Sequence, residues 1–212
     1  MSATNMKGAD TPVRTRLDGG IEVCFTNPGT SEMHFCAALD RVPGLRCVLG
    51  LFEGVVTGAA DGYGRMRDFP SATLLHTGPG LGNGLANLHN ARKARSPVVN
   101  IVGEHATYHI RHDAPLTSDI EGIAAPVSDW VKTSRNAEDV STDGAQAIAE
   151  ARKTPGRIAT LILPADTAWN EASSGATVPL VPNPETVNSN ALDEFVRVLR
   201  SGEPVMLLLG YK

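Results

Sequence analysis

The sequence predicts an α/β domain with a doubly wound, mostly parallel sheet that carries helices on both faces. Two observations point to this fold class. Short apolar runs alternate with helix-like stretches along the first 170 residues, and the runs are nearly continuous, as in strands that are covered on both sides. The chain of 212 residues also has 21 Gly and only 5% aromatic residues, which favours close packing of helices on strands over a β-sandwich.

Two strand–helix units are expected between residues 23 and 66. VCF, at 23–25, is apolar and leads through the polar turn NPGTSE into a helix at about 31–40. CVLGLF, at 47–52, predicts a second strand, and the small residues after it predict a helix at about 54–66. Glu53 therefore stands between a strand and the helix packed behind it, where burying a lone charge is costly.

The middle of the chain repeats this order. SATLLHT, at 71–77, predicts a third strand, and PVVNIVG, at 97–103, predicts a fourth that is followed by a long polar loop. Between them, we expect a Gly-rich turn at 78–84 and a helix at about 83–93. The turn, GPGLGNG, lacks the spacing of a dinucleotide motif and the Lys of a Walker motif, so we interpret it as a tight turn rather than a phosphate site.

Two further strands are expected at WVKTS (130–134) and IATLILP (158–164), on either side of an Ala-rich helix at about 137–152. The segment after them is rich in Pro, Ser and Asn and is typical of a linker. Beyond it, ALDEFVRVLRSG predicts a helix and EPVMLLLG predicts a buried strand. We therefore expect a first domain at 1–170, a linker at 171–190 and the start of a truncated second domain at 191–212.

The composition and charge argue against several other classes of protein. The net charge is −4 and there is no basic run, so a nucleic-acid partner is not expected. The cysteines Cys24, Cys36 and Cys47 lack CxxC spacing and are expected to be buried thiols in a reducing compartment. The N-terminus has no apolar signal region, and no stretch approaches the roughly 18 apolar residues of a membrane helix. We therefore expect a cytoplasmic protein with no membrane partner.

The candidate site residues follow the strands, because ligands of parallel sheets bind beyond the carboxyl ends. Glu53 is either a solvated carboxylate favoured by a helix dipole or a carboxyl that shares a proton with a bound heterocycle in an apolar pocket. His76 is either a core histidine or an active-site acid and base. The three histidines of the polar loop, His105, His109 and His112, are better explained by a loop that lines a cleft than by a metal site, so no metal ligand is expected in this chain.

Six segments resemble, in the same order, the N-terminal pyrimidine-binding domain of thiamine-diphosphate-dependent decarboxylases and carboligases, among them acetolactate synthase and benzoylformate decarboxylase. The similar segments, which fall between about residues 20 and 170, are VCFTNPGTSE, FEGVVTGAADGYGR, LLHTGPGLGNGLANL, SPVVNIVGE, DAPLTSDIEGIAAPVSDW and ATLILPADTAW.

This resemblance implies a role for Glu53. In the family, the corresponding Glu binds the N1′ nitrogen of the cofactor's aminopyrimidine and promotes the 4′-imino tautomer, which removes the thiazolium C2 proton. The cofactor supplies the electron sink, and the protein supplies orientation and proton transfer. The resemblance also implies that the cofactor is contacted by Glu53, Asn27, Pro28, Gly29, Thr77 and Asn83.

The pattern resembles the benzoylformate decarboxylase branch more than other branches. NPGTSE and LLHTG are similar to that branch, which implies that Thr30 contacts the substrate carboxylate and that His76 transfers protons. Pro115, Leu116 and Thr117 stand where acetolactate synthases carry Phe-Gln-Glu and where the decarboxylase carries Leu-Leu-Thr, so Leu116 and Thr117 are expected to line the substrate.

The implied function is the N-terminal part of a decarboxylase or carboligase that acts on a small 2-keto acid. The alternatives are an acetolactate synthase-like carboligase, one subunit of a split decarboxylase, and a non-catalytic module with the same fold. The family binds the diphosphate and Mg²⁺ through a C-terminal domain with a Gly-Asp-Gly motif, which these 212 residues lack. The chain alone is therefore expected to be inactive, and a homo-oligomer (dimer or tetramer) with the site between subunits is expected. The choice of 2-keto acid, and of decarboxylation or carboligation, stays open.

Overall fold

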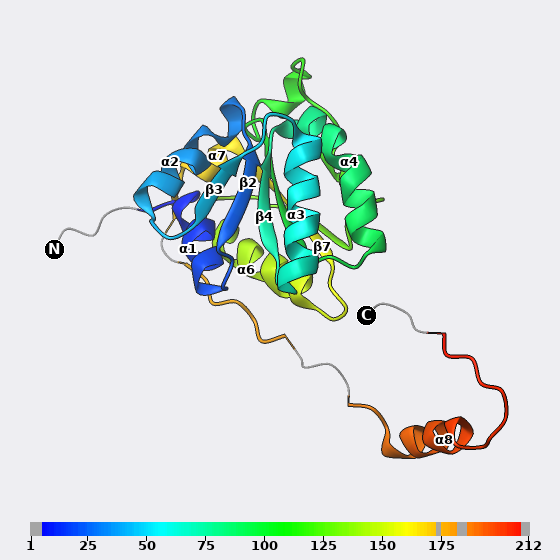
Figure 1. Cartoon of the computed structure of the whole chain (residues 1–212). Coiled ribbons are helices and arrows are strands. Elements are labelled where there is room, and N and C mark those ends of the chain that lie inside the picture. Colours follow the sequence, from blue (N-terminus) through cyan, green and yellow to red (C-terminus); the bar gives the residue numbers. More distant parts are fainter. Residues whose placement is uncertain (1–5, 173–174, 182–185, 209–212) are drawn as a thin grey trace. The chain divides into compact units, whose positions relative to one another are not determined.

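Figure 1 shows the computed structural model of the chain, which describes residues 6–172, 175–181 and 186–208. The chain divides into two units, Met1–Val181 and Pro182–Lys212, and each is described by itself. The first unit contains a sheet of six strands in the order β3-β2-β4-β5-β7-β6, and every neighbouring pair is parallel. The strands are β2 (Val23–Asn27), β3 (Arg46–Leu49), β4 (Ser71–Leu75), β5 (Val98–Glu104), β6 (Trp130–Thr133) and β7 (Ile158–Pro164).

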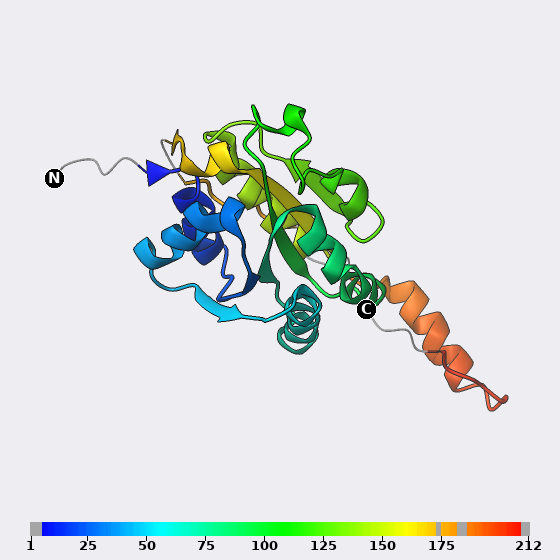
Figure 2. The ribbon, with the colours of Figure 1, turned by 90° about the horizontal axis from the view of Figure 1, so that it is seen from above.

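Helices cover both faces of this sheet, as the view in Figure 2 shows. One face carries α3 (Glu53–Arg67), α4 (Thr77–Lys93) and α5 (Ile120–Ala124), whose apolar residues share a core with Leu75, Val102 and Ile162. The other face carries α1 (Asp10–Asp18), α2 (Met33–Arg41), α6 (Asp139–Arg152) and α7 (Ala165–Trp169), which share a second core with Leu74, Ile101 and Leu161. The predicted doubly wound α/β class is confirmed.

The central strands explain why their sequences are almost wholly apolar. Every residue of β4, β5 and β7 is buried, because helices cover both faces of these strands. Register partners Val99 and Ala159 are both fully buried within the core that faces α1 and α6. The edge strand β3 has one neighbour only and is largely exposed. The sequence CVLGLF does not reveal this difference in burial, because it is as apolar as the sequences of the central strands.

Two sequence predictions are wrong in detail, and one helix was missed. The Gly-rich stretch 78–84 is not a turn, because α4 already begins at Thr77. Glycine costs about 1 kcal/mol relative to alanine inside a helix, but here the missing side chains let neighbouring groups approach closely. The second strand ends at Leu49 rather than at residue 52, because the chain turns at 50–52 to start α3. Helix α1 was not predicted at all.

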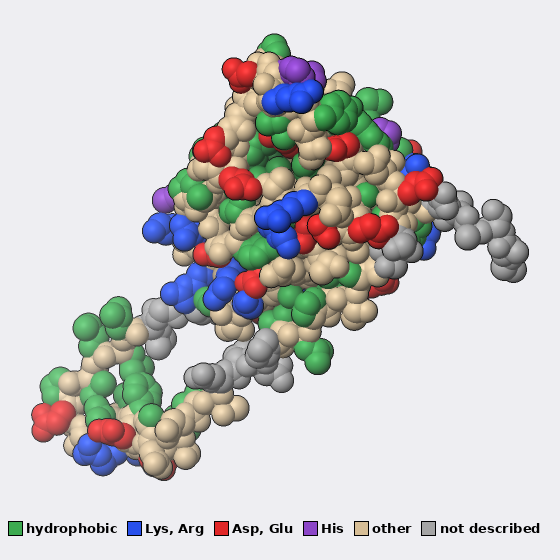
Figure 3. Space-filling model, turned by 180° about the vertical axis from the view of Figure 1, so that it is seen from behind, with side chains coloured by type: hydrophobic (Ala, Val, Ile, Leu, Met, Phe, Trp, Pro, Cys, Tyr) green, Lys and Arg blue, Asp and Glu red, His purple; other side chains and the backbone are tan. Residues whose placement is uncertain are grey.

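The remaining short elements close the first unit. β1 (Met6–Lys7) pairs antiparallel with β8 (Glu171–Ala172), so the first and last strands of this unit lie side by side. Two short 3₁₀ helices, η1 (Thr30–Glu32) and η2 (Ile110–His112), occur in the loops after β2 and β5. On the face in Figure 3, acidic and basic side chains of this unit are interspersed.

The second unit contains α8 (Ser189–Leu199), where a helix was expected. The side chain of Asn188 caps it by accepting hydrogen bonds from the backbone N–H groups of Asn190 and Ala191. The predicted strand EPVMLLLG is wrong for its described part, residues 203–208, which form neither helix nor strand. An apolar run needs a neighbouring strand to form a ladder, and the described part of this unit offers none. Within the described residues, no helix is long and apolar enough to cross a bilayer.

Candidate active site

Most of the predicted site residues follow the carboxyl ends of β3, β2 and β4, and Leu116 and Thr117 follow β5. β2 is followed by α2 on one face of the sheet, and β3 is followed by α3 on the other face. After β3 the chain returns past β2 to β4, so the direction in which successive strands are added reverses at this point. In doubly wound sheets a crevice forms at such a point, outside the carboxyl ends of the strands. The loops after β2, β3 and β4 therefore bring residues that are distant in sequence to one place.

Glu53 is the first residue of α3, directly after the extended Phe52. Its Oε2 accepts a hydrogen bond of 3.0 Å from Nδ2 of Asn83 on α4. Among the described residues, its Oε1 has no hydrogen-bond partner. A Cβ on Gly80 would lie 3.3 Å from this Oε1, so the glycine leaves the oxygen uncovered. The carboxylate is thus held by one oxygen and offers the other to a ligand.

The surroundings of Glu53 differ from the expected apolar pocket. Glu53 is half-buried, and the apolar side chains of Leu51, Phe52 and Val55 are all exposed, Leu51 to 91%. These residues lie at the end of β3 and the start of α3, on the same edge of the sheet as Glu53. The chain therefore supplies apolar surface beside the carboxylate but does not enclose it.

His76 lies at the end of β4 and pairs with Glu32, which follows β2. Nδ1 of His76 is 2.8 Å from Oε2 of Glu32, and the same oxygen accepts a 2.7 Å hydrogen bond from the backbone N–H of Gly29. The Glu32 side chain is only 1% exposed, whereas the imidazole is 22% exposed. Burial raises the pKa of Glu32 above its ordinary value, although the Gly29 N–H and His76 act in the opposite direction.

Glycines make room for this pair. A Cβ on Gly103 would lie within bonding distance of Oε1 of Glu32, and a Cβ on Gly29 would clash with the imidazole ring of His76. Oε1 of Glu32 is buried and has no hydrogen-bond partner among the described residues. Residues 29 and 103 therefore have to be glycines, without a Cβ, for the Glu32 side chain to reach His76.

Gly80 lies close to both Glu53 and His76. A Cβ on Gly80 would lie 3.3 Å from Oε1 of Glu53 and 3.6 Å from Cβ of His76. Gly80 thus stands between the two side chains, in the first turns of α4. The structure brings Glu53, His76 and Asn83 together, and Glu32 with them.

The other predicted cofactor contacts are placed around these groups. Asn27, at the end of β2, donates a 2.8 Å hydrogen bond to the carbonyl oxygen of Gly50 and so ties β2 to the β3–α3 loop. Pro28 and Gly29 are half-buried in the following loop, and Thr30 is exposed. Thr77 has a positive φ of 49°, and its buried hydroxyl has no partner among the described residues. This strained position starts α4 directly after His76.

The predicted substrate-lining residues Leu116 and Thr117 lie in the loop after β5. This loop reaches α4, because a Cβ on Gly78 would clash with Oγ of Ser118. Leu116 is 37% exposed, and the hydroxyl of Thr117 is buried without a partner in the described part of the chain. Ser118, which directly follows these two residues, therefore lies against the first turn of α4.

Sequence reasoning missed Glu32. It occurs in the quoted segment NPGTSE, but an acid at the start of a helix looks like an ordinary helix-dipole partner. Its contact with His76 spans 44 positions, so only the fold reveals it. The rings of His105, His109 and His112 form a row with centroid separations of 5.5 and 5.6 Å. Within the described residues, no group of three or more His, Cys, Asp or Glu could hold a metal ion.

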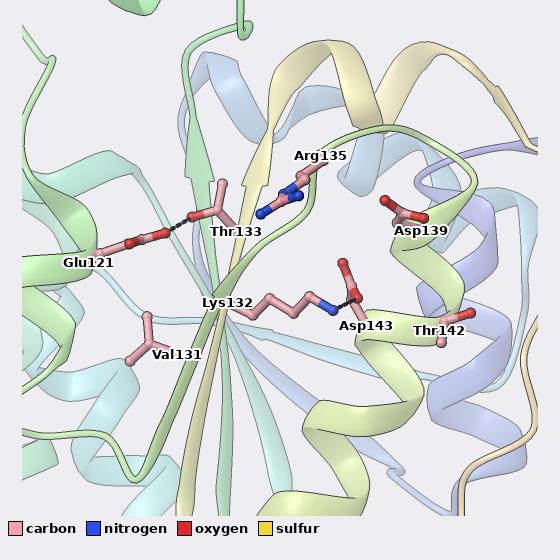
Figure 4. A pocket seen from close by; sticks show the side chains of 8 residues that line it. All are labelled: Glu121, Val131, Lys132, Thr133, Arg135, Asp139, Thr142 and Asp143. Atoms are coloured by element: carbon pink, nitrogen blue, oxygen red, sulfur yellow. Dashed lines mark hydrogen bonds and ion pairs between the residues drawn. The ribbon is translucent and has the colours of Figure 1, made fainter.

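A hollow of about 760 Å³ lies elsewhere, beside the other edge strand, β6, and contains none of the predicted site residues (Figure 4). Several of its polar and charged side chains bond to one another or to neighbouring residues. Nζ of Lys132 lies 2.6 Å from the buried Asp143, and Thr133 donates a hydrogen bond to Glu121. We therefore place the candidate active site at the carboxyl ends of the strands, where Glu53, His76 and Asn83 converge, and not in this hollow, which contains none of them.

Comparison with known proteins decides the family. The model of the family described as "Thiamine pyrophosphate enzyme, N-terminal TPP binding domain" matches residues 6–123, which is more than half of the chain. The chain belongs to this thiamine pyrophosphate (TPP) enzyme family. The matched range contains Glu53, His76, Asn83 and the loop with Leu116, so all predicted site residues of this TPP-binding domain lie within it.

Relatives of this TPP-binding domain include both branches that the motifs suggested. The chain is 56% identical over 206 residues to a Mycobacterium tuberculosis protein named "Putative acetolactate synthase large subunit IlvX", covering 97% of this chain and 39% of that protein. It is 33% identical over 157 residues to benzoylformate decarboxylase of Pseudomonas aeruginosa, covering 74% of this chain and 29% of that enzyme. The chain thus spans well under half the length of these relatives.

A solved structure shows the same fold. The TPP-dependent 4-hydroxybenzoylformate decarboxylase of Rhodococcus jostii RHA1 superposes with a TM-score of 0.85 at 26% sequence identity. The match covers 92% of this chain and 38% of that enzyme. The pyrimidine-binding fold expected from the motifs is therefore confirmed.

Proposed function

We propose that this chain presents Glu53 to the aminopyrimidine of thiamine diphosphate, as part of an enzyme that decarboxylates a 2-keto acid in the manner of benzoylformate decarboxylase. The observation that carries the proposal is the arrangement of the Glu53 carboxylate. Asn83 orients one oxygen, and Gly80 leaves the other open toward the crevice. A carboxyl held in this way can share a proton with a ring nitrogen.

The residues at the crevice fit such a cofactor. Oε1 of Glu53, which has no hydrogen-bond partner among the described residues, can accept a hydrogen bond from a ligand. Thr77, at the start of α4, is next to His76 in sequence, and its hydroxyl is buried. Asn27, Pro28 and Gly29 would line the same ring from the β2 side. When bound, thiamine diphosphate supplies the electron sink for loss of CO₂ from a 2-keto acid. Its diphosphate and Mg²⁺ would be held by a domain that these 212 residues do not contain.

His76 would move protons at the reacting end of the site. In the tautomer with its proton on Nδ1, a neutral His76 donates to Glu32, and Nε2 is left to accept a proton from the substrate-derived group or, as imidazolium, to deliver one to it. Thr30, on the exposed loop after β2, would bind the substrate carboxylate. Leu116 and Thr117 would line the substrate from the loop after β5.

A second subunit would complete the site. Leu51, Phe52 and Val55 form an exposed apolar surface beside Glu53, and such surfaces mark association sites. We propose that the diphosphate-binding domain of another subunit covers this surface, so that the enzyme is a homo-oligomer and Glu53 reaches a cofactor held by its neighbour. The apolar cover would also remove water from the carboxylate and strengthen its interaction with the ring nitrogen.

The second candidate function is an acetolactate synthase-like carboligase, favoured by the name of the 56% identical relative. The two reactions share the role of Glu53 and differ in whether a proton or a second keto acid captures the intermediate. The His76–Glu32 pair favours protonation, because it places a proton donor at the site. A split decarboxylase would need a separate chain with the diphosphate site, and a non-catalytic module would not need an open carboxylate.

The test uses the native gene product, whose length is first established by intact mass. It is assayed with benzoylformate and with pyruvate in the presence of thiamine diphosphate and Mg²⁺, and the products are identified as aldehyde or as acetolactate. Aldehyde from benzoylformate supports the proposed function, and acetolactate from pyruvate supports the second candidate. Glu53→Gln keeps the shape of the side chain and should reduce either activity at least about 100-fold. Near wild-type turnover by this variant would refute the role of Glu53.

A binding experiment on the chain itself needs no turnover. In ¹⁵N-labelled protein titrated with thiamine diphosphate and Mg²⁺, we expect amide shifts at Glu53, Gly80 and the Asn83 side chain. Glu53→Gln should weaken these shifts, whereas the exposed Glu22→Gln should leave them unchanged. Shifts confined to the hollow beside β6 would place the ligand elsewhere and contradict the proposal.

A further inference from the structure

The cysteines occupy one edge of the sheet, on the face covered by α2. Cys24 is fully buried on β2, Cys47 lies on the edge strand β3, and Cys36 is half-buried on α2. The expectation that all are buried is wrong for Cys47, which is exposed because β3 has a neighbour on one side only. None of these thiols takes part in the proposed reaction.

Cys24 and Cys47 are register partners on neighbouring parallel strands. Side chains of directly paired residues project from the same face, and adjacent strands lie about 4.8 Å apart. Disulfides join residues whose Cα atoms are about 4.4 to 6.8 Å apart, and the usual spacing of adjacent strands falls within this range. As an edge strand, β3 can also move slightly toward β2 without disturbing a third strand.

From this register we propose that Cys47 and Cys24 are a modification site, in which hydrogen peroxide oxidises Cys47 and Cys24 then closes a disulfide bond. The exposed thiol is the one that an oxidant can reach, and the buried thiol beside it is shielded from solvent but close enough to react. The site is independent of the proposed catalytic function.

The electrostatic surroundings support this order of reaction. A side-chain hydrogen bond between Cys24 and Cys47 lowers the pKa of Cys47 below its ordinary value, although burial and Asp40 act against it. Burial raises the pKa of Cys36, and the charges of Glu32, Cys47 and Asp40 act in the same direction. A thiolate is the reactive form of cysteine. Cys47 is therefore the more reactive of the two accessible thiols.

The chemistry balances with peroxide as the only oxidant. The Cys47 thiolate attacks one peroxide oxygen, the O–O bond breaks, and the products after proton uptake are a sulfenic acid and water. The Cys24 sulfur then attacks the Cys47 sulfur, the S–O bond breaks, and the hydroxyl leaves as water with the Cys24 proton. The two thiols are oxidised by two electrons in total, and the peroxide is reduced.

The test treats the 212-residue chain with an equimolar amount of hydrogen peroxide and measures its intact mass and its peptides. We expect a product that is two hydrogens lighter than the reduced chain. Trypsin leaves Cys24 and Cys36 on one peptide and Cys47 on another, so the same experiment is done with Cys36→Ser. This variant should still give the linked peptides, which then identify the Cys24–Cys47 bond.

Cys47→Ser provides the second arm, because an exposed residue can be replaced without a cavity in the core. This variant should form no bond and should stay reduced at the same dose. The proposal is overturned if Cys36→Ser no longer forms the linked peptides, if wild-type Cys47 proceeds to sulfinic acid while Cys24 stays reduced, or if Cys47 remains unmodified.

Discussion

The carboxylate of Glu32 lies 2.8 Å from Nδ1 of His76, and the carboxylate is almost wholly buried while the imidazole is partly open to the crevice. Two loops that follow different strands are joined by this contact. A histidine whose Nδ1 is bound in this way has one orientation and one free nitrogen, Nε2. The buried acid thus determines how an exposed base faces the site.

The first prediction concerns pH and stability. Because burial raises the folded-state pKa of Glu32, the folded chain binds this proton more tightly than the unfolded chain does. Between the ordinary value of 4.5 and the raised value, the free energy of unfolding should therefore fall as pH rises. Glu32→Gln removes this dependence. In urea titrations across that window, wild type should lose stability relative to Glu32→Gln as pH increases, and the exposed Glu22→Gln should parallel wild type. Parallel slopes for wild type and Glu32→Gln would contradict the prediction.

The second prediction concerns the role of His76. In the complete enzyme, His76→Ala should slow aldehyde release by about 100-fold or more, because the general acid is removed. Cofactor binding should change little, since Glu53 and Asn83 are untouched. Single-turnover kinetics and a cofactor titration separate the two effects. His89→Ala, at an exposed position on α4, serves as the control. An unchanged rate in His76→Ala would make His76 an ordinary core histidine.

The third prediction concerns the crossing of α3 and α4. A Cβ on Gly84 would lie 2.7 Å from Cγ2 of Thr57, and Oγ1 of Thr57 is 3.1 Å from the Gly84 carbonyl oxygen. Gly84→Ala should cost about 1 to 3 kcal/mol through this clash. In a Thr57→Ser background, which keeps the hydroxyl and lacks Cγ2, the cost should shrink or reverse, because Ala favours a helix by about 1 kcal/mol. Equal losses in both backgrounds, measured by urea unfolding, would refute the steric explanation.

The fourth prediction assigns a structural role to the ADGYGR motif. Asp61 accepts two hydrogen bonds from the Arg65 guanidinium, at 2.8 and 2.7 Å, and a third from Oγ of the buried Ser96. This joins α3 to the loop before β5. Asp61→Asn should lower the free energy of unfolding by about 1 to 3 kcal/mol, since charged acceptors are lost. Cofactor shifts at Glu53 should persist. The exposed Asp40→Asn controls for charge, and an unaltered melting temperature in Asp61→Asn would disprove this role.

The sequence predicted the sheet well because strands such as 97–103 and 158–164 are buried on both faces and are apolar throughout. Glu53, His76 and Thr77 could be placed near one another for the same reason, since they follow strands whose carboxyl ends share one edge. The sequence does not predict the hydrogen bond between Asn83 and Glu53, because the glycines of 78–84 indicate a turn and not the helix that carries Asn83.

Other features depend on contacts that no local pattern encodes. The helical glycines of α4 look like turn formers until Thr57 and Ser118 are seen to occupy the space beside them. Glu32 looks like a helix-dipole partner until β4 brings His76 to it. The apolar run at 203–208 shows the opposite case: it has the local pattern of a strand but does not form one. An apolar run forms a strand only where a neighbouring strand can pair with it.

The pairing of Met6 with Ala172 brings the two ends of the segment 6–172 next to each other within the first unit, which continues to Val181. A module whose entry and exit are adjacent can be joined to other modules at one place on its surface, and its own sheet is not stretched by the modules attached to it. The segment 6–172 of the TPP-binding domain can therefore be transferred into a related protein as one unit. Replacing the corresponding segment of a related enzyme by residues 6–172 of this chain would transplant Glu53, Glu32 and His76 together, and would keep their mutual geometry.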